Sequence, residues 1–131
     1  MNSLNYGSRE ACGRLFKAGI VLETDFYWCD NLGWVTLRPK EDVPIESCDW
    51  KIYPALSLAD AWRELPDEIN DKEITHSLDV WKSGELTYCA YTDYQNNTMP
   101  EDGINNINPA DALIYLLIWV MTVLPSLFVA K

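Results

Sequence analysis

The residues of this chain that could do acid–base or nucleophilic chemistry are few. His76 is its only histidine, and it falls in a stretch that predicts a strand. A catalytic histidine needs a nucleophile and an orienting carboxylate beside it, yet the adjacent Ser77 must face the other side of that strand. We therefore expect His76 to be a surface or half-buried strand residue, and we expect no enzyme activity.

Paired carboxylates could supply an acid and a base, or bind a hard cation. The pairs are Glu41–Asp42, Asp67–Glu68 and Glu101–Asp102. Each falls in a predicted loop without the alternating ligand spacing of a calcium loop, which favours solvated charge. The chain also has no CxxC pair, no Cys/His cluster and no glycine-rich phosphate loop. We expect no metal site and no cofactor.

The cysteines predict a reducing environment. They are Cys12, Cys29, Cys48 and Cys89. Their wide spacing is typical of small buried hydrophobic residues or free thiols. Residues 1–19 carry four charges and no continuous apolar segment, so we expect no secretion signal and a cytoplasmic protein.

The chain is strongly acidic. Ten Lys and Arg residues face twenty Asp and Glu residues, which gives a formal net charge of −10. This charge repels nucleic acid phosphates and suits a basic protein partner, although it also serves simply to keep a small domain in solution. We expect no direct binding of nucleic acid.

Aromatic residues are the best candidates for a binding surface. Six tryptophans and seven tyrosines exceed what a core of this size requires, and aromatic residues are enriched at interfaces. The candidate recognition face consists of Trp28, Trp34, Trp81 and Tyr88. The alternative is that these side chains pair across strands and shield an open sheet face.

Two similar units of helix and hairpin should position these residues. Residues 8–18 predict a short helix between the N-cap Ser8 and Gly19, and residues 25–37 predict a hairpin whose turn ends in Gly33. Residues 38–49 read as a loop, and residues 50–53 as a brief extended piece.

The second unit starts at Ser57, which forms a capping box with Asp60. One face of the helix that follows carries its apolar side chains, Leu58, Ala61, Trp62 and Leu65. Residues 74–81 and 85–91 predict a second hairpin, and residues 92–108 predict the longest loop.

The order of elements is α-ββ-α-ββ-α once the last helix is included. Asn108 as N-cap and Pro109 at the first helical position predict that helix over residues 109–124. The fold class is therefore α+β, in a single domain spanning residues 1–131. Its two hairpins form an antiparallel sheet of about four strands, with three helices covering one face.

The end of the chain has two interpretations, because residues 112–130 contain no charged side chain. Such a run either spans a membrane, which takes about 20 apolar residues, or is buried in a core or subunit contact. Pro125 divides the run and no basic cluster flanks it, which favours burial. We expect the helix and the tail 125–131 to form a homodimer interface that includes Trp119, Leu127 and Phe128.

Several motifs follow one another along the chain: SREACGRLFKAGI, TDFYW, YPALSLADAWRELP and NPADALIYLLIWV. In this order they resemble a widespread group of small uncharacterised proteins encoded by tailed phages and prophages of anaerobic gut bacteria. The resemblance covers most of the chain. It implies a phage or mobile-element origin and the cytoplasm of a bacterial host cell, and it implies no activity.

We therefore expect a non-enzymatic phage or prophage accessory protein that acts by binding a protein, possibly a basic one. One alternative is an acidic mimic of nucleic acid that inhibits a host defence nuclease or another nucleic-acid-binding protein. A further alternative is a small protein with a C-terminal membrane anchor.

Overall fold

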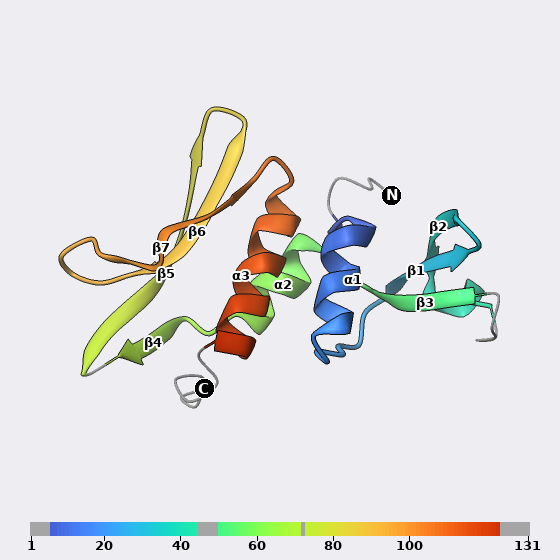
Figure 1. Ribbon diagram of the computed structural model, residues 1–131, viewed down its shortest axis with the longest axis horizontal. Coiled ribbons are helices and arrows are strands. Elements are labelled where there is room, and N and C mark those ends of the chain that lie inside the picture. Colours follow the sequence, from blue (N-terminus) through green and yellow to red (C-terminus); the bar gives the residue numbers. More distant parts are fainter. Residues whose placement is uncertain (1–5, 45–49, 72, 124–131) are drawn as a thin grey trace.

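The fold is that of a computed structural model, which describes residues 6–44, 50–71 and 73–123. These residues form three α-helices, seven strands and one short 3-10 helix. In chain order the elements are α1 (Arg9–Lys17), β1 (Phe26–Asn31), β2 (Trp34–Pro39), η2 (Lys40–Asp42), β3 (Trp50–Ala55), α2 (Leu58–Glu64), β4 (Glu68–Asp71), β5 (Ile74–Ser83), β6 (Leu86–Thr92), β7 (Thr98–Asn106) and α3 (Pro109–Val123). Figure 1 shows the helices in the middle of the molecule and strands at both ends.

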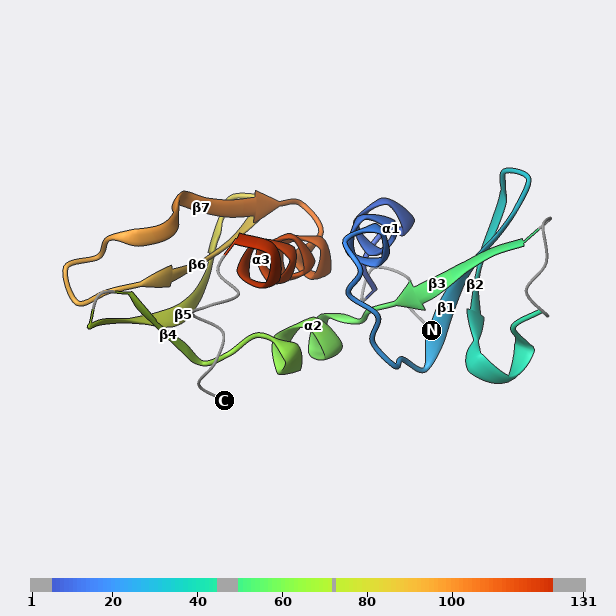
Figure 2. The same ribbon diagram turned by 60° about the horizontal axis from the view of Figure 1, so that its bottom comes forward.

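The α+β class is confirmed, but the predicted single four-stranded sheet is wrong. The strands form two antiparallel sheets, with the orders β2-β1-β3 and β4-β5-β6-β7. Each sheet is built around one of the two predicted hairpins, β1–β2 and β5–β6. The helices lie between the sheets (Figure 2), so the prediction that they cover one face of one sheet is also wrong.

Strands β4 and β7 were not predicted, and β3 was predicted only as a brief extended piece, because their pairing is not encoded in a local pattern. The predicted extended piece becomes the full strand β3, which pairs with β1 along its whole length. Strand β7 lies in the predicted long loop and contains Pro100 and Gly103, which are poor strand formers. An irregular register between Cys89 and Tyr91 of β6 accommodates this part of β7, as a β-bulge does. Strand β4 is short and buries one apolar side chain, that of Ile69.

Local turn and capping signals are confirmed. Leu32 and Gly33 have φ values of 50° and 94° and join β1 to β2, as a two-residue hairpin turn requires. The Ser57–Asp60 capping box is present at the start of α2. The Oδ1 atom of Asn108 accepts a hydrogen bond from the backbone N–H of Ala110 at 2.9 Å, which caps α3.

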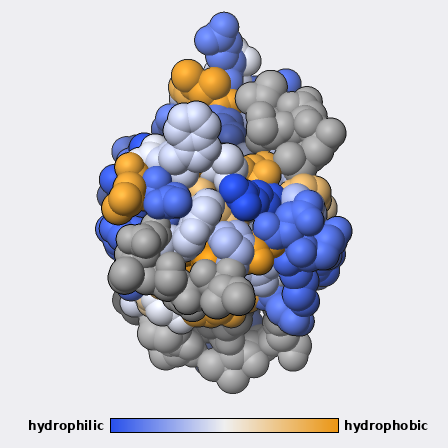
Figure 3. Space-filling model, turned by 90° about the vertical axis from the view of Figure 1, so that its right-hand side faces the viewer, coloured by the Kyte–Doolittle hydropathy of each residue, from blue (hydrophilic) through white to orange (hydrophobic). Residues whose placement is uncertain are grey.

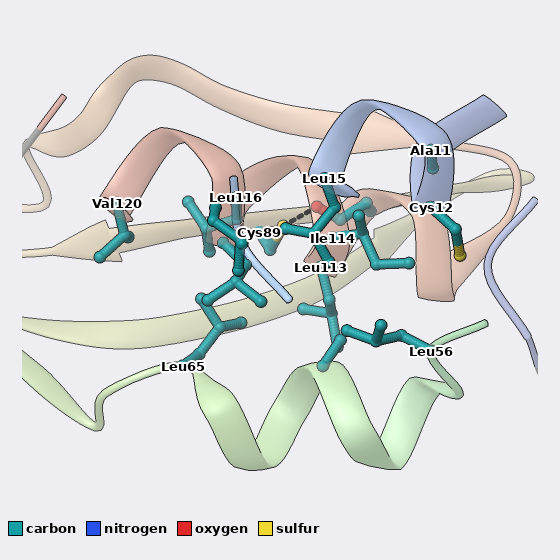
Figure 4. Packing of buried hydrophobic residues seen from close by; sticks show 14 of the residues in the cluster. Ala11, Cys12, Leu15, Leu56, Leu65, Cys89, Leu113, Ile114, Leu116 and Val120 are labelled. Carbon is teal, nitrogen blue, oxygen red and sulfur yellow. Dashed lines mark hydrogen bonds between the residues drawn. The ribbon is translucent and has the colours of Figure 1, made fainter. Parts of the chain in front are cut away.

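Helix α3 is the centre of the core. Eight of its fifteen residues are buried, and they meet side chains of α1, α2 and the inner face of the β4–β7 sheet (Figure 4). Tyr115, Ile118 and Trp119 form a half-buried face of the same helix. The Sγ atom of Cys89 lies 3.2 Å from the carbonyl oxygen of Ala112, which ties β6 to α3. No helix in the described ranges is both long and apolar enough to span a bilayer. The apolar segment up to Val123 is thus a core helix.

A short N-terminal segment, residues 6–8, ties the three helix starts together. Its backbone meets α2 where the N–H of Gly7 donates to the carbonyl oxygen of Leu56 at 2.7 Å. It meets α3 where the N–H of Ser8 donates to the Oδ1 atom of Asp111 at 2.6 Å. Because Ser8 is also the N-cap of α1, this segment fixes the three helices relative to one another.

Candidate functional site

The structure places His76 beside a carboxylate, although not in a catalytic arrangement. The Nε2 atom of His76 lies 3.9 Å from the Oδ2 atom of Asp93, and both side chains are buried. Asp93 is occupied by three hydrogen bonds, from the backbone N–H groups of Gln95 and Asn97 and from the side-chain amide of Asn97. No serine or cysteine of the described chain forms a hydrogen bond with His76. The pair holds the turn after β6.

The Asp93 carboxylate in this turn should make the stability of the fold depend on pH. Burial raises the pKa of Asp93, but hydrogen bonds from Asn97 and Gln95 and the nearby His76 outweigh it, so that the pKa lies below its ordinary value of 3.8. Since the folded state favours the ionised form, the carboxylate stabilises the fold above pH 3.8, and that contribution is lost as the pH falls through the lowered pKa.

We expect the free energy of unfolding of Asp93→Asn to fall less than that of the wild type between about pH 5 and about pH 3. Urea unfolding of both proteins at these two pH values measures this difference. An equally steep loss in the variant would show that other carboxylates account for the acid sensitivity.

The described cysteines are poor nucleophiles. Cys12, Cys29 and Cys89 are buried and free. Burial raises the pKa of Cys12 to about 11 and that of Cys89 to about 12, so both stay protonated at neutral pH. Cys48 lies outside the described residues. Within those residues, no three His, Cys, Asp or Glu side chains gather closely enough to bind a metal ion.

The four aromatic candidates do not form one face. Trp28 packs against the core, and its Nε1–H donates to the carbonyl oxygen of Gly7 at 3.1 Å. Trp34 is 74% exposed next to the first hairpin turn. Trp81 and Tyr88 are cross-strand neighbours in the other sheet, with ring centroids 5.5 Å apart and planes inclined by 11°. The predicted recognition face is therefore divided between two sheets and the core.

The Trp81–Tyr88 stack covers the outer face of the β4–β7 sheet, which is the face turned away from α3. Beneath it, Ala90 is fully buried although it lies on this outer face. A Cβ atom on Gly103 would lie 3.6 Å from Trp81, so this glycine lets β7 pass close to the indole ring. The stack thus shields the sheet, as the alternative interpretation of the aromatic residues states.

Of the predicted interface residues, only Trp119 is described. It is half-buried and packs against the core from α3. Leu127 and Phe128 lie outside the described residues.

A different surface has the shape of a binding site. It is an apolar groove of about 500 Å³ between α2, strands β5 and β6, and the start of α3. Its lining residues are Leu58, Ala59, Trp62, Val80, Lys82, Thr87, Pro109 and Leu113. We call this surface the α2 groove. Trp62 is 53% exposed and Leu58 is 40% exposed.

Sequence reasoning assigned these two residues to the packed face of α2, together with Ala61 and Leu65. The structure divides that face, because Ala61 and Leu65 are fully buried whereas Trp62 and Leu58 stay at the surface. The spacing of these residues gives no signal of the division. Positions 58, 61, 62 and 65 follow the i, i+3, i+4, i+7 pattern of a single packed face, although α2 itself ends at Glu64 and Leu65 is its C-cap.

Comparison of the chain with protein-family models, curated proteins and solved structures finds no match. The resemblance to phage and prophage proteins therefore stays a prediction. Function must be argued from the surfaces of the molecule itself.

The two parts of the sequence before and after α2 begins differ in charge. Residues 1–56 contain eight acidic and six basic side chains, whereas residues 57–131 contain twelve and four. At the end formed by the β1–β3 sheet, hydrophobic residues show as separate patches between hydrophilic ones (Figure 3). The α2 groove belongs to the acidic half.

Proposed function

We propose that the protein acts without catalysis, by binding a protein partner in the α2 groove. The observation that carries this proposal is the exposure of Trp62 in a concave surface where six of the eight lining residues are apolar. An exposed tryptophan leaves a large apolar area in water, and burial of such area drives association. Tryptophan is also enriched among the residues that dominate binding energy.

The groove suggests the chemistry of the partner. It would accept one or two aliphatic or aromatic side chains, for example from a helix or an extended segment. The charged residue among those that line the groove is Lys82, whereas residues 57–131 as a whole carry twelve acidic and four basic side chains. A partner segment that presents apolar side chains flanked by Lys or Arg fits both properties.

The cellular context proposed for this interaction rests on the resemblance to phage and prophage proteins. The resemblance supports an accessory role for a phage or prophage, in the cytoplasm of a bacterial host. The homodimer expected from the sequence would use a different surface, formed by Trp119 and the tail 125–131. A second copy of the chain seated in the α2 groove would be a separate mode of self-association.

The test is capture of partners from host lysate by the tagged full-length protein, without detergent. We expect Trp62→Ala to reduce the captured partner at least tenfold, since truncation of an anchoring tryptophan costs about 2 kcal/mol or more. Trp34→Ala is the matched control, because Trp34 is even more exposed but lies in the other sheet. It should capture as the wild type does.

Equal capture by the Trp62 and Trp34 variants would refute the groove as the binding site. Trp81→Ala should then be measured, since its loss of capture would move the site to the outer face of the β4–β7 sheet. Sedimentation of the same variants distinguishes a second copy of the chain from a different protein.

A second candidate is the nucleic-acid mimic, and the charge of residues 57–131 favours it. It requires that the captured protein bind nucleic acid, that duplex DNA or RNA compete with capture, and that salt weaken it steeply. Capture that is unchanged by salt and competitor nucleic acid would exclude this candidate and leave the apolar groove as the cause of binding.

A further inference from the structure

A cleft of about 530 Å³ separates α1 from the β1–β3 sheet, in the less acidic half of the chain. Its lining residues are Arg9, Glu10, Gly13, Arg14, Lys17, Asp30, Lys51 and Tyr53. We call it the basic cleft. Four of the ten basic residues of the chain line it, beside two acidic residues, in a protein whose net charge is −10. The cleft thus has the opposite charge to the molecule as a whole.

The geometry of α1 creates this cleft. Arg9, Gly13 and Lys17 are spaced by four residues and therefore lie along one face of the helix. Gly13 has no side chain, so the space between the two cations stays open above the ring of Tyr53. A Cβ atom on Gly13 would lie 3.9 Å from that ring. Strand β3 contributes Lys51 from the opposite wall.

The acidic residues of the cleft already have partners. Glu10 forms an ion pair with Arg14 at 3.1 Å, and the Oδ1 atom of Asp30 accepts a hydrogen bond from the N–H of Gly33 at 2.9 Å. In contrast, Arg9, Lys17 and Lys51 form no ion pair within 4.0 Å with any carboxylate that the structure describes.

Three cations without an ion pair among the described carboxylates line this one cleft, in a chain with twice as many acidic as basic residues. Like charges that share a cleft repel one another, and this repulsion is relieved when an anion binds between them. The guanidinium of Arg9 offers a planar set of donors suited to phosphate or carboxylate, and the lysine ammonium groups add point charges.

Tyr53 adds a neutral donor to the cleft. Burial raises the pKa of its phenol, although the positive charge of Arg9 acts in the opposite direction, so the hydroxyl stays protonated at neutral pH. The volume of the cleft falls within the range of small-molecule sites, about 300–1,000 Å³. The site is thus of small-molecule size and rich in donors.

We propose that the basic cleft binds a small oxyanion with at least two negative charges, held by Arg9, Lys17 and Lys51. The charge requirement follows from the four basic and two acidic residues of the lining. A phosphorylated molecule and a polycarboxylate share this chemistry, and the experiment distinguishes them. The site is separate from the α2 groove and does not depend on the proposed function.

The experiment is thermal unfolding of the full-length protein with pyrophosphate, phosphate, citrate or chloride at equal ionic strength. A ligand that binds only the folded state raises the melting temperature, and the rise grows with the logarithm of the ligand concentration once that exceeds the dissociation constant. We expect pyrophosphate or citrate to raise it more than chloride does. A larger rise with pyrophosphate identifies a phosphorylated ligand, and a larger rise with citrate identifies a carboxylate.

Charge reversal locates the site. We expect Lys51→Glu to weaken binding of the effective anion at least tenfold, measured by calorimetric titration. Lys82→Glu is the matched control, because it makes the same change in net charge from a cation in the other sheet that also lacks an ion pair among the described residues. It should bind as the wild type does.

The proposal is overturned if no oxyanion stabilises the protein beyond chloride, or if both reversals weaken binding equally. In the second case the anion responds to total charge and not to the basic cleft. Arg9→Gln is a second variant with a smaller change in charge, and we expect it to weaken binding of the anion as well. It serves as the test if Lys51→Glu does not fold.

Discussion

Replacing Leu117 with alanine is expected to lower the free energy of unfolding by about 3 kcal/mol. Leu117 is fully buried in α3, which packs against both other helices and the β4–β7 sheet. Truncation removes the transfer free energy of the lost methyl and methylene groups and leaves a cavity that the neighbouring elements fill only in part. Urea unfolding followed by tryptophan fluorescence measures the change.

Val123→Ala is the control for this prediction. Val123 is the last residue of the same helix and is 59% exposed, so its truncation should change the free energy of unfolding by about 0.5 kcal/mol or less. If the two variants lost the same stability, α3 would not be the core helix of the fold. The comparison also separates core burial from a role of α3 in a membrane, where Leu117 would make no contribution to unfolding in water.

Gly7→Ala is expected to destabilise the fold by about 2 kcal/mol. Gly7 lies where the N-terminal segment crosses the starts of α2 and α3. A Cβ atom there would overlap the Cδ1 atom of Ile114 and lie 3.0 Å from the Sγ atom of Cys12. Both neighbours are buried, so the added methyl group must displace side chains of the core.

Gly13→Ala makes the same chemical change with the opposite expected sign. Its Cβ atom would make ordinary contact with Tyr53, at 3.9 Å, and alanine favours a helix interior by about 1 kcal/mol over glycine. We expect this variant to be more stable than the wild type by about 0.5–1 kcal/mol. Circular dichroism during urea unfolding measures both variants. Equal effects at the two positions would mean that the N-terminal segment does not pack as the structure shows.

Helix starts and hairpin turns could be predicted because a few neighbouring residues decide them. Ser57 and Asp60 satisfy each other's exposed amides within one helical turn, and Gly33 adopts the positive φ that the first hairpin needs. These interactions form between residues close in sequence, so the printed sequence contains all the partners. The capped start of α3 at Asn108 belongs to the same class.

The number of sheets could not be predicted in this way. Strand β7 carries Pro100 and Gly103 within a polar segment, and it becomes a strand because β6 offers an edge to pair with. The two hairpins likewise belong to separate sheets, because the helices that pack between them keep them apart. Sheet pairing depends on which segments meet after packing, and local propensity contributes little to it.

The candidate sites, like the fold, could be predicted only in part from the sequence. The aromatic content predicted a binding surface, but Trp28 is half-buried and packs against the core, and Trp81 stacks on Tyr88 over its own sheet. Trp62 and Leu58 stay exposed on α2 whereas Ala61 on the same predicted face is buried, and this division follows from how α2 packs against α3. The spacing of Arg9, Gly13 and Lys17 could be read from the sequence, whereas the position of Lys51 opposite them could not.

By itself, the sequence determined the fold class, the capped helix starts, the two hairpins and an excess of negative charge, because these depend on composition and on neighbours along the chain. Tertiary structure alone decided that the strands form two sheets and that the apolar last helix lies at the centre of the core. It also decided which aromatic and basic side chains stay at the surface. Those outcomes depend on contacts between residues far apart in sequence. Burial of apolar surface drives these contacts, and it happens only when the helices and sheets pack together.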